Sequence, residues 1–131
     1  MTLHPAVVVH GLGDALETLA VGRPVTLLSA RGAALYAGCL WWREMVTRAR
    51  AAHPAVPALD ILDCADAPGR ALAAIRAGQR ILVLAPAVPG FPAVAAIAAA
   101  HGLILLTERP PAIDLAGPGG VRGLPAWLAS A

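Results

Sequence analysis

The chain has an unusually small set of polar side chains. Its 131 residues include no lysine and no asparagine, and serine occurs only at Ser29 and Ser130. Charged residues make up 14% of the chain and aromatic residues only 4%. A catalytic site would therefore have few chemical groups to draw on.

The basic residues do not form a run in the sequence. All ten are arginines, they are distributed along the chain with eight acidic residues, and the formal net charge is only +2. Proteins that bind nucleic acids usually concentrate Lys and Arg in a run or on one face. We therefore expect no nucleic-acid partner.

Cysteine is also scarce, since the chain contains only Cys39 and Cys64. Neither belongs to a C-x-x-C pair or to a Cys/His pattern typical of a metal site, so reduced thiols are expected. The first residues, Met-Thr-Leu-His-Pro, lack the basic start and apolar segment of a secretory signal. These two features predict a cytoplasmic protein.

No hydrophobic segment is both long and uninterrupted. The stretch 81–107 has no charged residue, and a transmembrane helix needs about 20 apolar residues. Residues that break helices interrupt this stretch at Pro86, Pro89, Gly90, Pro92 and Gly102. It therefore divides into strand, turn, helix, turn and strand, and no membrane partner is expected.

Short apolar segments are what the sequence has in abundance. Hydrophobic residues form 58% of the chain and the mean hydropathy is +0.69, which indicates side chains buried on more than one side. The segments do not alternate with polar residues, as is typical of strands covered on both faces. The five predicted strands are Ala6 to His10, Val25 to Ser29, Leu59 to Cys64, Ile81 to Ala85 and Leu103 to Thr107.

Helical segments are predicted between these strands, from their starting residues, their glycine stops and their apolar spacing. The longest has Leu35, Cys39, Trp42, Val46 and Ala49 on one stripe. The predicted helices cover about 14–21, 31–52, 66–77 and 91–101, with a last turn over 124–128.

Alternating β and α elements predict an α/β fold. We expect a single three-layer αβα domain over residues 1–131, with helices on both faces of a five-stranded, mostly parallel sheet. A flavodoxin-like strand order 2-1-3-4-5 and a Rossmann-like order 3-2-1-4-5 fit the pattern equally well. After Pro110 and Pro111, a short segment Ile113–Leu115, a glycine-rich stretch and the last helical turn form a tail. We expect this tail either to add an edge strand to the sheet or to reach another subunit.

Most of the scarce polar residues follow the predicted strands. In open α/β sheets, ligands bind beyond the carboxyl ends of the strands. A hydroxyl, a guanidinium and free backbone N–H groups after the second strand favour a phosphate or carboxylate. We therefore predict a domain that binds an anionic small molecule, with no cofactor identified. Its candidate ligand-binding residues are Ser29, Arg31, Gly32, Asp63, Asp66 and Arg70.

An enzyme is the first alternative. Cys64 would be a nucleophile if a neighbouring His10 lowered its pKa, and these two residues are weak catalytic candidates. Carboxylates of Asp63, Asp66 and Glu108 suit a hard divalent cation, but they have no signature spacing, so no metal site is assigned.

A structural or interaction protein is the second alternative. Tyr36, Leu40, Trp41 and Trp42 lie on the longest predicted helix. Adjacent helical residues point about 100° apart, so the two tryptophans cannot both face one sheet. Trp and Tyr are also enriched in the cores of interfaces. These four residues are therefore the candidate interface of a homo-oligomer.

Overall fold

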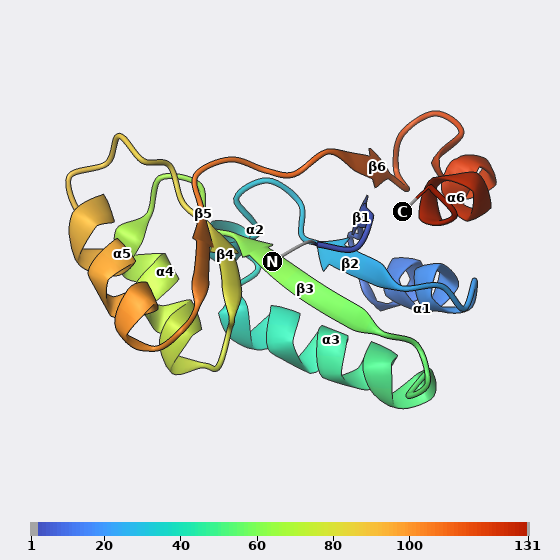
Figure 1. Ribbon diagram of the computed structural model, residues 1–131, viewed down its shortest axis with the longest axis horizontal. Coiled ribbons are helices and arrows are strands. Elements are labelled where there is room, and N and C mark those ends of the chain that lie inside the picture. The colour runs from blue at the N-terminus through green and yellow to red at the C-terminus, as the bar shows by residue number, and fades with distance from the viewer. Residues whose placement is uncertain (1–2, 131) are drawn as a thin grey trace. The chain divides into compact units, whose positions relative to one another are not determined.

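The protein has an α/β fold with a parallel sheet, as the sequence predicts, and the computed structural model describes residues 3–130 (Figure 1). The strands are β1 (Ala6–Val8), β2 (Val25–Leu28), β3 (Ala58–Asp63), β4 (Ile81–Val83), β5 (Ile104–Leu106) and β6 (Ala112–Asp114). The helices are α1 (Leu12–Leu19), α2 (Ala33–Tyr36), α3 (Cys39–Ala52), α4 (Pro68–Arg76), α5 (Phe91–Ala100) and α6 (Gly120–Leu128).

Contacts divide the chain into two compact units. The first unit comprises Met1–Ala30, Glu44–Asp60 and Pro110–Ala131, and the second comprises Arg31–Arg43 and Ile61–Arg109. β3 and α3 each contribute residues to both units. The single domain expected from the sequence stays a prediction.

In the first unit, β1 is the central strand. It pairs in parallel with β2 on one side and with β6 on the other, so that Ala6 lies opposite both Thr26 and Ala112. Every residue of β1 and β2 is buried. The indole Nε1 of Trp127 in α6 donates a hydrogen bond to the carbonyl oxygen of Ala6 at 2.7 Å. This bond ties the C-terminal helix to the first strand.

In the second unit, β4 pairs in parallel with β3 and β5. These three strands follow one another in one direction across the sheet, and crossovers between parallel strands are right-handed. The helices of both crossovers therefore lie on the same face of this part of the sheet. Figure 1 shows α4 and α5 side by side, and the two helices contact each other.

The strand order is β5-β4-β3-β2-β1-β6. It differs from both 2-1-3-4-5 and 3-2-1-4-5, although it keeps the single reversal beside β1 that the Rossmann-like order has. The added C-terminal edge strand is confirmed, and β6 forms it with Ala112–Asp114. Short apolar runs encode strands but not their neighbours, which explains why the order was not predicted.

The single long helix predicted over 31–52 is wrong. Two helices replace it, and the chain turns at Gly38, whose φ of +89° lies in the left-handed region that favours glycine. The N–H groups of Ala37 and Gly38 both donate to the carbonyl oxygen of Ala33, which closes α2 after one turn. The apolar stripe continues through this turn and so concealed it.

Within residues 3–130, no helix combines the length and the apolar character needed to cross a membrane.

Alanine substitutions at two glycines of the first unit should change its stability in opposite directions. A Cβ at Gly120 would collide with the backbone carbonyl oxygen of Asp114, whereas a Cβ at Gly13, inside α1, would meet no atom within 4 Å. We expect Gly120→Ala to lower the free energy of unfolding by about 1–3 kcal/mol. Gly13→Ala should raise it by about 0.5–1 kcal/mol through helix propensity. Urea denaturation measures both, and equal effects of the two substitutions would contradict this packing.

Candidate functional site

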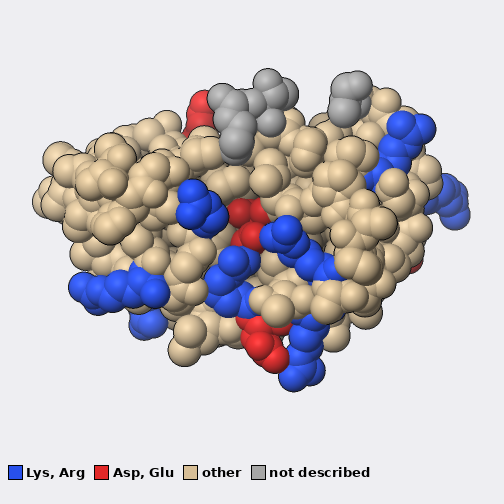
Figure 2. Space-filling model, turned by 60° about the horizontal axis from the view of Figure 1, so that its bottom comes forward, with Lys and Arg blue, Asp and Glu red and all other residues tan. Residues whose placement is uncertain are grey.

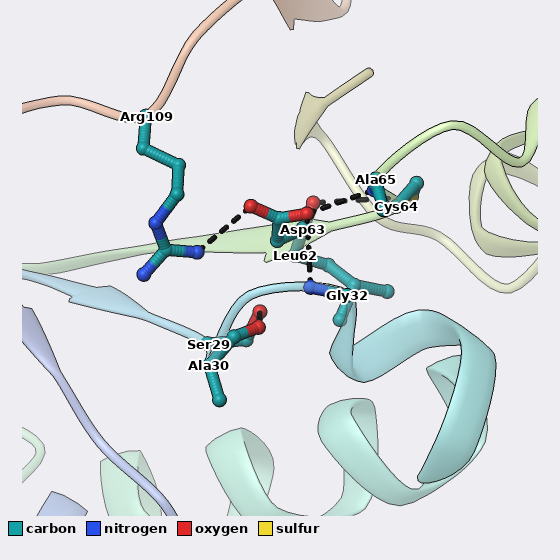
Figure 3. A network of polar contacts seen from close by, with 8 residues as sticks. All are labelled: Ser29, Ala30, Gly32, Leu62, Asp63, Cys64, Ala65 and Arg109. Carbon is teal, nitrogen blue, oxygen red and sulfur yellow. Dashed lines mark hydrogen bonds and ion pairs between the residues drawn. The ribbon is translucent and has the colours of Figure 1, made fainter. Parts of the chain in front are cut away.

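The carboxylate of Asp63, at the end of β3, is the centre of the polar network in the second unit (Figure 3). Oδ1 accepts the backbone N–H groups of Ala65 at 2.8 Å and Gly32 at 3.1 Å. Oδ2 accepts a guanidinium N–H of Arg109 at 2.8 Å. A buried carboxylate needs such partners, because its charge has lost the solvation of water.

The ion pair between Asp63 and Arg109 is largely shielded from solvent. The side chain of Asp63 is 3% exposed and that of Arg109 is 15% exposed. The sequence does not reveal this pairing, since the two residues are 46 positions apart. It arises because β5 lies beside β4, and the segment that follows β5 then brings Arg109 to the end of β3.

Ala65 has the one left-handed non-glycine backbone conformation among residues 3–130, with φ of +49°. This conformation costs an alanine about 1–2 kcal/mol. Two hydrogen bonds hold it: its N–H donates to Asp63, and its carbonyl oxygen accepts the N–H of Ala85 at 2.8 Å. Such strained backbone is concentrated at ligand and active sites. Ala65 therefore marks the turn after β3 as a functional candidate.

A cavity of about 590 Å³ lies beside this turn. Its volume falls in the range of small-molecule sites, about 300–1,000 Å³. The wall comes from the carboxyl ends of β3, β4 and β5 and from the residue before Gly32, as expected for an α/β sheet. The lining residues are Arg31, Asp63, Ala65, Asp66, Val83, Ala85, Thr107, Glu108 and Arg109.

Charges of both signs surround the cavity. Arg109 is already paired with Asp63. Arg31 is exposed and makes no ion pair with any residue of the described range 3–130, so its guanidinium is available to a ligand. The carboxylates of Asp66 and Glu108 are exposed on the same lining. Apart from the cavity, Figure 2 shows arginine and acidic side chains interspersed on one face of the molecule.

The other predicted ligand-binding residues do not line the cavity. Gly32 contributes its N–H to Asp63, and α2 after it has only four residues, so the helix N-terminus expected for an anion is not available. Ser29 belongs to the first unit, is buried, and donates to the carbonyl oxygen of Ala30 at 3.0 Å. Arg70 is exposed on α4. Neither Ser29 nor Arg70 is among the lining residues.

The two catalytic candidates have different surroundings. Cys64 is buried, its Sγ is 3.9 Å from the carbonyl oxygen of Leu62, and its pKa rises from 9.0 to about 12. The causes are first burial, then the charge of Asp63, then Cys39. His10 lies in the first unit, where its Nε2 is 2.7 Å from Oδ1 of Asp114. The pairing of Cys64 with His10 stays a prediction, and the raised pKa opposes a thiolate nucleophile.

The carboxylates at the cavity do not form a metal site. Among residues 3–130, no group of three or more His, Cys, Asp and Glu side chains is placed to hold a metal ion. Asp63 already uses both of its oxygens for N–H donors. The alternative of a cation on Asp63, Asp66 and Glu108 therefore gains no support.

No protein family model and no curated protein sequence matches the chain.

We expect the Asp63–Arg109 pair to act as an energetic unit. Removal of either partner leaves a largely buried charge without its ion-pair partner, so Asp63→Ala and Arg109→Ala should each lower the free energy of unfolding by about 3 kcal/mol. The double variant should lose less stability than the two single variants combined. The difference should be about 1 kcal/mol or more. Chemical denaturation of all four proteins measures this. Arg70→Ala, an exposed control, should change stability by at most about 0.5 kcal/mol, and strict additivity would contradict the coupling.

We expect Cys64 to resist alkylation in the folded protein. Iodoacetamide at neutral pH should modify only the half-buried Cys39, and Cys64 should react after unfolding. The folded state raises the pKa of Cys64, so the thiol ionises first in the unfolded chain as the pH increases. The contribution of Cys64 to stability is therefore fully present below pH 9. That stability should decrease as the pH rises from 9 towards 12, more steeply than in Cys64→Ala. Rapid labelling of native Cys64 would show instead an accessible, activated thiol.

Proposed function

We propose that the second unit binds a small anionic molecule that also carries hydrogen-bond donors. The observation that supports this most directly is the cavity at the carboxyl ends of β3 to β5, with Arg31 on its lining. Arginine recognises carboxylates and phosphates through a planar fork of N–H donors. The proposed role of Arg31 is to hold the anionic group.

The acidic residues narrow the class of ligand. Asp66 and Glu108 would repel a simple polyanion, but they would accept hydrogen bonds from an ammonium or hydroxyl group. Arg109 adds little free positive charge, because Asp63 neutralises it. A ligand with an anionic group at one end and donors at the other fits this distribution of charge best. Amino acids and hydroxylated acids belong to this class.

The proposed compartment is the cytoplasm. The support is chemical: Cys39 and Cys64 are both free thiols. Free thiols of this kind persist in reducing compartments.

The proposal is tested by thermal unfolding of the full chain with aspartate, succinate or inorganic phosphate. Aspartate differs from succinate by one ammonium group, so it should raise the melting temperature more. A shift of about 4 °C is expected for each kcal/mol of binding free energy.

Variants assign the response to the cavity. Arg31→Ala should abolish the shift, whereas Arg76→Ala, on the exposed last turn of α4, should keep it. Asp66→Asn should remove the preference for aspartate over succinate. If none of the three compounds stabilises the wild type, or if Arg31→Ala responds as the wild type does, the proposed function is wrong.

A further inference from the structure

The segment Leu35–Trp41, around the turn between α2 and α3, presents apolar side chains to solvent. Tyr36 is 70% exposed and Leu40 is 73% exposed, with Leu35 at 41% and Trp41 at 38%. Four large apolar side chains within seven consecutive residues form a patch, in contrast to the isolated exposed Ile97 and Val121. We refer to Leu35, Tyr36, Leu40 and Trp41 as the α2–α3 patch.

We propose that the α2–α3 patch is a homodimer interface, which buries the same patch of a second copy of this chain. This inference does not depend on the proposed ligand site.

The exposed apolar area of the patch is close to what a small stable dimer needs. The fractional exposures of the four side chains correspond to about 350 Å² of apolar surface. The smallest specific interfaces bury about 600 Å² on each partner. Slightly more than half of such an interface is apolar, so each partner buries about 350 Å² of apolar surface. The remaining area would come from polar residues at the rim.

The charge of the segment favours a second copy as the occupant. A two-fold interface places each patch opposite itself, so any charge in the patch would face a like charge. The eleven residues Gly32–Trp42 contain no Arg, Asp or Glu, and the nearest charged residues along the chain are Arg31 and Arg43. The patch therefore places no charged side chain of its own opposite a second copy of itself.

Trp41 is already held in place before any partner binds. Its ring lies against that of Trp42, with 6.1 Å between the centroids and 47° between the planes, and Trp42 is fully buried. Association therefore has little side-chain entropy to remove from Trp41. Trp42 is the one residue of the predicted interface that belongs to the core, where it supports Trp41.

The test is sedimentation velocity of the full chain over a range of concentrations. Wild type should change from monomer to dimer, and its melting temperature should rise with protein concentration. Leu40→Glu should raise the dissociation constant about 100-fold or more, because two carboxylates would then face each other.

Ile97→Glu, on α5 of the same unit, is the matched control and should dimerise as the wild type does. Circular dichroism verifies that both variants fold. A wild type that stays monomeric at millimolar concentration, or a Leu40→Glu variant that dimerises normally, overturns the proposal. A dimer that Ile97→Glu weakens as strongly as Leu40→Glu would also overturn it, because the interface would then not be specific to the patch.

Discussion

The buried charge of Asp63 is the constraint on which the second unit depends. A carboxylate that is 3% exposed has to be satisfied by the protein itself, and three separate segments provide its partners. The turn before α2 contributes Gly32, the turn after β3 contributes Ala65, and the segment after β5 contributes Arg109. One side chain thus fixes the relative positions of three loops, and these loops line the cavity.

This arrangement also explains the charge that remains for a ligand. Because Asp63 neutralises Arg109, the buried wall of the cavity is close to neutral. The exposed wall then carries the remaining charges, with Arg31 of one sign and Asp66 and Glu108 of the other. Under the proposed function, structural and recognition roles are therefore separated: buried groups hold the loops, and exposed groups are left for binding.

The sequence predicted the elements of the fold better than their arrangement. The strands from Ala6 and Ile81 begin where they were expected, because buried parallel strands are continuous apolar runs. The turn at Gly38 was missed, since the apolar stripe continues across it. Strand order was missed because it depends on contacts between distant segments.

Part of the candidate site was predictable, because residues that follow parallel strands meet at one edge of the sheet. Arg31, Asp63 and Asp66 lie at the carboxyl ends of strands, and the structure places all three on one cavity. Arg109 as the partner of Asp63 follows only from the position of β5 beside β4. The strain at Ala65 has no signal in the sequence, because nothing in an alanine indicates a positive φ.

The position of β6 has a consequence for how the chain folds. Strands β1 to β5 each lie beside the next in the sequence, so the growing chain can add them one at a time. The other edge of β1 is paired much later, because its partner strand, Ala112–Asp114, lies far along the chain. Until those residues are synthesised, β1 keeps a row of unpaired N–H and C=O groups, the kind of strand edge at which chains aggregate. The strand Ala112–Asp114 thus covers the edge of β1 that would otherwise stay open.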